Sequence, residues 1–253
     1  MDLLGYSDEF FQKALSRNIR VLTRGKSSVK KPLAILLGGQ SGSGKTTIHR
    51  IKIEEYQGNL IVIDGDSFRY QHPNYNQLQE IYGKESVNYT RDFAGKMVEA
   101  LIEQLSDRGY QLLIEGTLRT VEVPQKTATL LKTKNYTIEL AVMATKPELS
   151  YLSTLIRYEE LYVKDPNSAR ATPKEHHDAI VDHLVENLQD LQEKEIFDKI
   201  QIYQRGRRCC YDSSKDSESA AKVLHALLFG EWTMVEKEML KLGNSRLEEL
   251  KGK

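Results

Sequence analysis

The stretch LLGGQSGSGKTT, at residues 36–47, decides the fold, because it joins an apolar strand to a phosphate-binding loop. Residues 39–46 match the pattern G-x-x-x-x-G-K-[ST] in full. Glycines let the backbone turn tightly and direct its N–H groups at phosphate oxygens, and the following helix adds the positive end of its dipole. With average glycine content, a chance match somewhere in such a chain is roughly a one-per-cent event. The sequence therefore predicts a site for a nucleotide triphosphate.

The residue types of this loop predict individual contacts with ATP and Mg²⁺. Lys45 should reach the β- and γ-phosphates, and the hydroxyl of Thr46 should ligate Mg²⁺. Glu115 closes the later run QLLIEG and is expected as a second acid near the metal, acting directly or through water. The alternative for Glu115 is an ordinary solvated carboxylate at a strand end. The residues expected to hold the nucleotide are Gly39, Gln40, Ser41, Gly42, Ser43, Gly44, Lys45, Thr46 and Thr47.

Composition excludes several classes of protein. The 253 residues include 36 lysines and arginines and 36 aspartates and glutamates, so the formal net charge is zero. A neutral chain is a poor candidate for nonspecific binding to nucleic acid or to anionic membranes. No apolar run approaches the ~20 residues of a membrane helix, and residues 1–13 carry acids where a signal peptide would be basic. We therefore expect a cytoplasmic location.

Cys209 and Cys210 are adjacent, cannot join distant segments, and are expected to be reduced thiols.

Apolar runs alternate with helical patterns along the chain. The runs are LAILLGG, LIVIDGD, YQLLIEG, YTIELAVMA and KIQIYQR, and helical spacing separates them, for example over residues 90–105. This alternation predicts right-handed crossovers and a mostly parallel sheet covered on both faces. We therefore expect an α/β P-loop kinase fold whose sheet has five or more strands.

One kinase domain is expected over residues 1–253, with helical additions. Residues 7–23 have the spacing of an amphipathic helix. Phe10 and Phe11 project about 100° apart on such a helix, so one should pack inward while the other stays near the surface. The additions are an N-terminal helix and linker (1–30), a helical lid region broken by VKDPNSARATP (147–194), and C-terminal helices that begin near Ser217 and Thr233 (215–253).

The phosphate loop does not show which group accepts the phosphate, but the other motifs favour a small kinase. The guanine-reading motif N-K-x-D of GTPases is absent, and the letters D-x-x-G at residues 92–95 lie inside a helical pattern. A motor or AAA-type ATPase would be longer and would need sensor elements that are not found.

In VIDGDSFR, Asp66 follows a strand at the carboxyl edge of the sheet, where such folds bind ligands. A carboxylate there can accept the proton of an acceptor hydroxyl. The alternative for Asp66 is a helix N-cap.

Three further groups of polar residues carry weaker signals. Residues 67–83 are rich in tyrosine, asparagine and glutamine, which suit a base or a sugar but also an ordinary surface loop. Arg157 and Arg170 can supply the positive charge that phosphoryl transfer needs, closing over the triphosphate as a lid, although arginine is common on helix surfaces. His176, His177 and His183 lack the one-turn spacing of helical zinc ligands, so a solvated helix face is expected.

These residues, in this order, resemble the zeta toxin family over nearly the whole chain. The segments that carry the resemblance are AILLGGQSGSGKTTIHRIK, VIDGDSFR, DFAGKMVE, LLIEGTLRT, ATKPELSYLSTLIRYEELY and ARATPKEHH. Many families share the phosphate loop, whereas EGTLRT and LSYLSTLIRYEEL are far more specific.

The resemblance implies an activity, a partner and a set of site residues. Zeta toxins are P-loop kinases that phosphorylate the 3′-hydroxyl of the amino sugar in UDP-N-acetylglucosamine, which blocks an early step of peptidoglycan synthesis. A small helical antitoxin obstructs their nucleotide site. By this resemblance Lys45 is the phosphate lysine, Asp66 the base, and Glu115 the acid near metal and substrate. The remaining implied residues are the γ-phosphate arginines Arg157 and Arg170 and the substrate contacts Glu99, Thr117, Arg119 and Thr127.

Two other functions remain open at the level of sequence. The first is another small-molecule kinase, such as a nucleoside or antibiotic phosphotransferase, which would share the phosphate loop and the acid after the second strand. The second is a regulatory module that binds nucleotide and a partner but transfers nothing. A module that transfers nothing would not explain why Asp66, Arg157 and Arg170 occur together.

Overall fold

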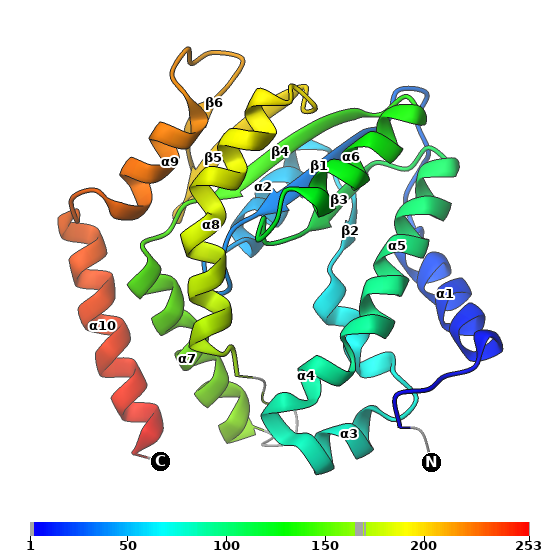
Figure 1. The fold of residues 1–253 in the computed structure, drawn as a ribbon, viewed down its shortest axis with the longest axis horizontal. Coiled ribbons are helices and arrows are strands. Elements are labelled where there is room, and N and C mark those ends of the chain that lie inside the picture. The colour runs from blue at the N-terminus through cyan, green and yellow to red at the C-terminus, as the bar shows by residue number, and fades with distance from the viewer. Residues whose placement is uncertain (1–2, 165–168, 170, 253) are drawn as a thin grey trace.

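A six-stranded sheet forms the centre of the molecule. The computed structural model describes residues 3–164, 169 and 171–252. The strand order is β2-β3-β1-β4-β5-β6, with β1 in the interior of the sheet (Figure 1). The strands are β1 (Leu33–Gly38), β2 (Ile61–Ile63), β3 (Leu112–Glu115), β4 (Thr137–Met143), β5 (Lys199–Gln204) and β6 (Arg208–Asp212). The first five pair in parallel, which confirms the predicted α/β sheet.

The sixth strand, β6, was not predicted. It pairs antiparallel with β5 through a tight turn in which Gly206 and Arg207 both have positive φ, as short hairpin turns require. It also contains Cys209 and Cys210, both of which are free thiols. The segment RRCCYD lacks the apolar alternation that signals a strand, so only its pairing with β5 reveals it.

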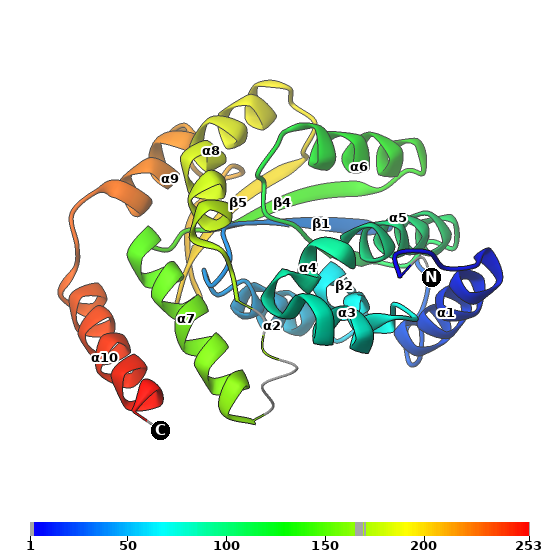
Figure 2. The same ribbon diagram turned by 60° about the horizontal axis from the view of Figure 1, so that its bottom comes forward.

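Alternate side chains of β1 enter two different hydrophobic clusters, so both faces of the sheet are buried. Ala34 and Leu36 pack on one face, and Leu33, Ile35 and Leu37 pack on the other. The helices α5 (Arg91–Asp107), α6 (Glu122–Thr133), α8 (Lys174–Glu193) and α9 (Ala220–Phe229) contribute to the first cluster. The helix α2 (Thr46–Glu55) covers the second face, and Figure 2 shows α6 and α8 on one side of the sheet with α2 on the other.

The N-terminal helix α1 (Asp8–Leu22) packs against α5 at one end of the molecule. Ser7 caps it by accepting a hydrogen bond from the backbone N–H of Phe10. Phe11 is buried and its ring meets Phe93 edge-on, while Phe10 stays 37% exposed, which confirms the expected split between the two side chains. Asn18 exchanges two hydrogen bonds with Gln71, so α1 also braces η1 (Gly65–Gln71), the 3-10 helix that carries Asp66.

The predicted helical lid region contains α7 (Pro147–Lys164) and α8, and α10 (Met234–Lys251) packs along α7 (Figure 1). Thr233 and Glu236 form a capping box that starts α10. Three short helices, α3 (Tyr75–Tyr82), η2 (Gly83–Glu85) and α4 (Ser86–Tyr89), connect η1 to α5. Across the described ranges, every helix is too short or too polar to cross a membrane.

Candidate active site

The phosphate loop connects β1 to α2 with the backbone conformations that its glycines permit. Gly39, Gly42 and Gly44 have φ angles of +131°, +73° and +100°, a region that L side chains rarely adopt. A Cβ atom on Gly42 would lie 2.1 Å from the carbonyl oxygen of Ser150. The glycine pattern therefore reflects both backbone torsion and close packing against α7.

Lys45 is buried at the end of this loop. Its Nζ donates to the carbonyl oxygens of Gly39 at 2.9 Å and Gln40 at 3.2 Å, and it lies 3.7 Å from Oε1 of Glu115. Burial lowers the pKa of Lys45, and the charge of Glu115 opposes that shift. The amine is thus held against the loop by two of its carbonyl oxygens.

Side chains at the ends of β4 and β5 fix the loop from behind. Thr145 donates to the carbonyl oxygen of Ser43 at 2.7 Å, and Arg205 donates from Nε to the same oxygen at 3.2 Å and from Nη2 to the carbonyl of Gly42. Burial lowers the pKa of Arg205. Sequence reasoning missed Arg205, although its position directly after a predicted strand at the carboxyl edge of the sheet was a signal for it.

Three carboxylates lie at the carboxyl ends of β2 and β3, where Asp64 and Asp66 follow β2 and Glu115 is the last residue of β3. Burial first, and then the charge of Glu115, raise the pKa of Asp64. Burial also acts to raise the pKa of Glu115, but a hydrogen bond from His49 and the charge of Lys45 lower it overall. His49 Nε2 lies 2.9 Å from Oε2 of Glu115, and the Glu115 side chain is 25% exposed. Glu115 is therefore a paired, partly buried acid rather than an ordinary solvated carboxylate.

Asp66 stands at the start of η1 and is oriented by Arg69. Arg69 donates from Nε to Oδ1 of Asp66 at 2.6 Å and from Nη1 to the carbonyl oxygen of Val87 at 2.7 Å. The alternative reading of Asp66 as a helix N-cap is wrong, because the carboxylate of Asp64 caps η1 by accepting from the backbone N–H of Asp66. The Asp66 side chain stays 69% exposed, so an acceptor can approach it.

The residues implied as substrate contacts lie on the two helices α5 and α6 and on the loop that follows β3. Glu99 on α5 pairs with Lys126 at 3.5 Å, which brings α5 next to the part of α6 that carries Thr127. Thr117 and Arg119 lie just after β3, where the Thr117 hydroxyl accepts from the Arg119 backbone N–H at 3.3 Å. Arg119 Nη1 then lies 3.4 Å from Nδ1 of His176 on α8.

Charges from several elements converge on Lys45. Glu115, Arg157, Asp66 and Asp64 all act on its pKa, with Arg157 lowering it and the acids raising it. Arg157 is an exposed residue of α7. Arg170 lies outside the described residues. The structure thus brings Lys45, Asp66, Glu115 and Arg157 within electrostatic reach of one another.

The histidine cluster differs from the expectation of a solvated helix face. His177 is 1% exposed, and its Nε2 lies 2.8 Å from the hydroxyl oxygen of Ser150. The expectation is wrong for His177 because the first turn of α8 packs against α7, which the sequence spacing does not show. His183 remains exposed, 3.9 Å from Glu186. Among the described residues no group of three or more His, Cys, Asp or Glu side chains is arranged to hold a metal ion.

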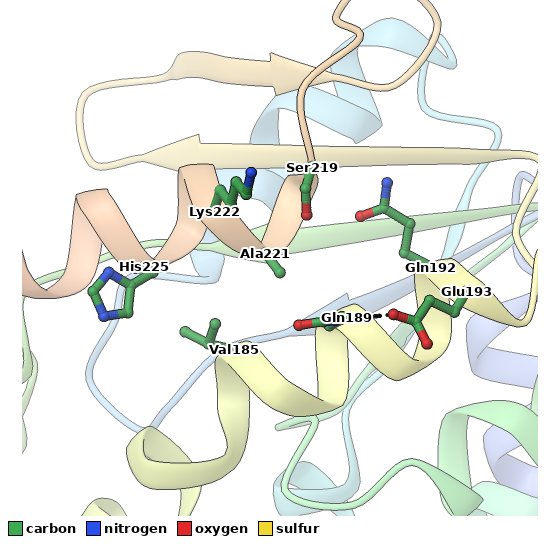
Figure 3. A pocket seen from close by; sticks show the side chains of 8 residues that line it. All are labelled: Val185, Gln189, Gln192, Glu193, Ser219, Ala221, Lys222 and His225. Atoms are coloured by element: carbon green, nitrogen blue, oxygen red, sulfur yellow. Dashed lines mark hydrogen bonds between the residues drawn. The ribbon is translucent and has the colours of Figure 1, made fainter.

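A separate groove of about 780 Å³ lies along the seam between α8 and α9 (Figure 3). Val185 and Gln189 line it from α8, and Lys222 and His225 line it from α9. None of the residues predicted for the site borders it. The groove follows the packing of the two helices, where Gln192 accepts a hydrogen bond from the first backbone N–H of α9.

A central parallel strand leads through a glycine loop into a helix, and carboxylates lie at the carboxyl ends of β2 and β3 in the same sheet, an arrangement that defines a P-loop kinase. The comparisons with known proteins then identify the family. The sequence model of the zeta toxin family matches residues 19–216. The chain belongs to the zeta toxin family.

Its relatives resemble it over most of their length. Toxin PezT of Streptococcus pneumoniae is 67% identical over 250 residues, covering 99% of both chains, and Toxin zeta of Streptococcus pyogenes is 46% identical, covering 81% of this chain and 71% of that protein. A solved structure from a study of the PezAT chromosomal toxin–antitoxin system of Streptococcus pneumoniae superimposes with a TM-score of 0.93 at 65% identity, covering 99% of this chain and all of that one. The native AvrRxo1-ORF1:AvrRxo1-ORF2 complex shares only the fold, with a TM-score of 0.65 at 12% identity.

Proposed function

We propose that this chain is the toxin of a toxin–antitoxin pair and transfers the γ-phosphate of ATP to the 3′-hydroxyl of the amino sugar of UDP-N-acetylglucosamine. The observation that carries the proposal is the joint placement of Lys45 and Asp66. The lysine lies where the phosphate donor would bind, the exposed carboxylate follows β2 at the same edge of the sheet, and its charge acts on the pKa of Lys45. The accumulated phosphosugar would inhibit peptidoglycan synthesis.

Phosphoryl transfer then follows from the side chains in place. Lys45 exchanges its bonds to the carbonyls of Gly39 and Gln40 for bonds to the β- and γ-phosphates. Asp66, held by Arg69, accepts the proton of the acceptor hydroxyl as its oxygen bonds to the γ-phosphorus and the bond to the β-phosphate oxygen breaks, releasing ADP. Arg157 supplies positive charge as negative charge builds on the transferring group. The resemblance assigns Arg170 the same role.

The residues at the metal position fit a magnesium ion. Mg²⁺ prefers oxygen ligands, and Thr46 and Glu115 offer a hydroxyl and a carboxylate beside the loop. Asp64 adds a half-buried carboxylate whose raised pKa reflects partial burial and the nearby charges of Glu115 and Asp66, an excess of negative charge that a divalent cation would offset. When bound, the ion would neutralise phosphate charge. Thr46 and Glu115 would hold it, and Asp64 would support them.

The acceptor side fits a polar sugar nucleotide. Glu99 and Thr127 come from α5 and α6, and Thr117 and Arg119 come from the loop after β3. Together they offer a carboxylate, two hydroxyls and a guanidinium, which suit sugar hydroxyls and a diphosphate. Incubating the protein with ATP and a panel of UDP-sugars, nucleosides and aminoglycosides, followed by mass spectrometry, tests this assignment. Mass gain of one phosphoryl group confined to a nucleoside or an antibiotic would replace it with another small-molecule kinase.

The partner is proposed to be a small helical antitoxin that covers the phosphate loop in the cytoplasm of the producing cell. An active kinase of this kind would harm that cell, and a helix over the loop excludes ATP directly. Inhibition should weaken as ATP rises and stay independent of the UDP-sugar concentration when the partner exchanges during the assay. For a complex too tight to exchange, a structure of the pair with the phosphate loop open to solvent would contradict the proposal.

A further inference from the structure

A buried chain of hydrogen bonds connects the first turn of α8 to the phosphate loop. His177 Nε2 lies 2.8 Å from the hydroxyl of Ser150 on α7, and Gln40 of the loop donates from Nε2 to the same hydroxyl at 3.1 Å. Ser150 and Gln40 are fully buried, and His177 is 1% exposed. On its other side, His177 Nδ1 lies 3.1 Å from Oδ1 of Asp178, which fixes the ring.

The order Ser150, His177, Asp178 has the composition of a hydrolytic triad, but its burial excludes that role. A nucleophilic serine must reach a substrate carbonyl, whereas the Ser150 hydroxyl is enclosed and also bonded to the carbonyl of Pro147 at 2.9 Å. A buried, hydrogen-bonded network of this kind instead fixes the relative position of the elements that it joins.

The two neighbouring histidines of α8 contact opposite halves of the site. His177 connects to Gln40, beside the phosphate donor. His176 lies 3.4 Å from Arg119 on the acceptor side, and the charge of Asp66 acts on it. The first turn of α8 therefore connects, through Ser150, to the loop proposed to bind the donor and contacts Arg119, which is proposed to bind the acceptor.

We propose that His177 is a positioning residue for phosphoryl transfer, and that its link through Ser150 to Gln40 holds the acceptor side at a fixed distance from the γ-phosphate. This inference rests on the kinase activity proposed above. His177 touches neither substrate; it acts through Gln40 on one side and through the placement of α8 on the other. Displacing reacting groups by about 1 Å can cost a factor of about 10² in rate, so loss of this contact should lower turnover more than it weakens substrate binding.

The test compares the variants His177→Leu, His177→Gln and Ser150→Ala with the control His183→Leu, an exposed histidine of the same helix. Turnover, the KM for each substrate, the ATP dissociation constant and the melting temperature are measured for each. We expect His177→Leu to lose about 10- to 100-fold in turnover while its affinity for ATP changes less than about threefold. His177→Gln, whose amide can hydrogen-bond to the Ser150 hydroxyl near the former position of Nε2, should recover most of the loss. Adding Ser150→Ala to His177→Leu should cost little more, because both break the same link.

A merely structural role predicts a different pattern. The proposal is overturned if the losses are additive, or if turnover per folded molecule stays at the wild-type level while only the melting temperature falls. Should His177→Leu fail to fold, His177→Gln and Ser150→Ala carry the test.

Failure of the proposed function is recognised separately. If the proposed function is wrong, the wild-type protein leaves UDP-N-acetylglucosamine unmodified. Hydrogen exchange in residues 39–45 and 174–180 then decides the inference, since it needs no acceptor. Faster exchange in both segments of His177→Leu supports the link, and a change confined to residues 174–180 contradicts it.

Discussion

Arg69 donates from Nε to Oδ1 of Asp66 at 2.6 Å, three residues away on the same 3-10 helix. The second arm of Arg69 is bonded to the carbonyl oxygen of Val87, so the guanidinium ties Asp66 to the α4 segment. The carboxylate proposed as the base is therefore held in one orientation by a partner that the sequence analysis did not single out. That orientation, relative to Lys45, is the geometric basis of the proposed transfer.

Removing the base should abolish transfer while leaving ATP binding nearly intact. For Asp66→Ala we expect turnover to fall by about 10²- to 10⁴-fold, because proton acceptance and acceptor positioning are both lost. Single-turnover kinetics and calorimetric titration with ATP measure the two effects. Asp182→Ala, an exposed aspartate of α8, is the matched control. An Asp66 variant that retains most of its transfer rate would remove Asp66 from the mechanism.

The arginine of α7 should matter most in the transition state. Arg157→Ala is expected to lower turnover more than it raises either KM, since charge on the transferring group peaks during transfer. Arg170→Ala should behave alike if the resemblance holds for that residue. Arg246→Ala, an exposed arginine of α10 that pairs with Glu160 of α7 at 3.3 Å, provides a control. Unchanged turnover with a raised KM would make Arg157 a simple binding residue.

The pair His49–Glu115 predicts a pH dependence of stability. The pKa of Glu115 in the folded protein lies below its ordinary value of 4.5. A depressed pKa means that the carboxylate stabilises the fold above the unfolded pKa and loses that contribution as the pH falls through the folded value. The free energy of unfolding of wild type, minus that of Glu115→Gln, should therefore be larger at about pH 7 than at about pH 3. Urea denaturation measures both, and a difference that grows in acid would contradict the assigned pairing.

Gly42 allows a direct test of loop packing. An alanine there must adopt a φ of +73° and place its Cβ 2.1 Å from the Ser150 carbonyl oxygen. Gly58→Ala is the matched control, because Gly58 has a φ of +77° with open space around it. Both variants should lose about 1–2 kcal/mol from left-handed backbone strain. Only Gly42→Ala should also lose ATP affinity, and equal ATP affinity in the two variants would show that the loop tolerates the Cβ.

The sequence was sufficient for what depends on local pattern. The run before Gly39 predicts a buried strand, the spacing of Gly39, Gly44 and Lys45 predicts the loop, and the acid of VIDGD predicts a group at the sheet edge. Each of these signals lies within a few residues of the feature that it predicts. The five parallel strands followed from the same kind of local evidence.

What could not be predicted depends on residues far apart in the chain. β6 exists because it pairs with β5, and Arg205 reaches the loop across 162 positions. His177 is buried because α7 lies against it, although its spacing on α8 resembles that of a solvated residue. Likewise, the local pattern at Asp66 does not exclude a helix N-cap, and only the contact of Asp64 with the Asp66 backbone N–H excludes it.

The identity of the acceptor oxygen tests the central claim most directly. The protein is incubated with ATP and either UDP-N-acetylglucosamine or its analogue that lacks the sugar 3′-hydroxyl, and the products are analysed by ³¹P–¹H correlation NMR. We predict that the complete sugar gains one phosphoryl group coupled to the proton on carbon 3′ and that the 3′-deoxy analogue gains none. Phosphate on any other oxygen, or equal phosphorylation of the 3′-deoxy analogue, would contradict the account.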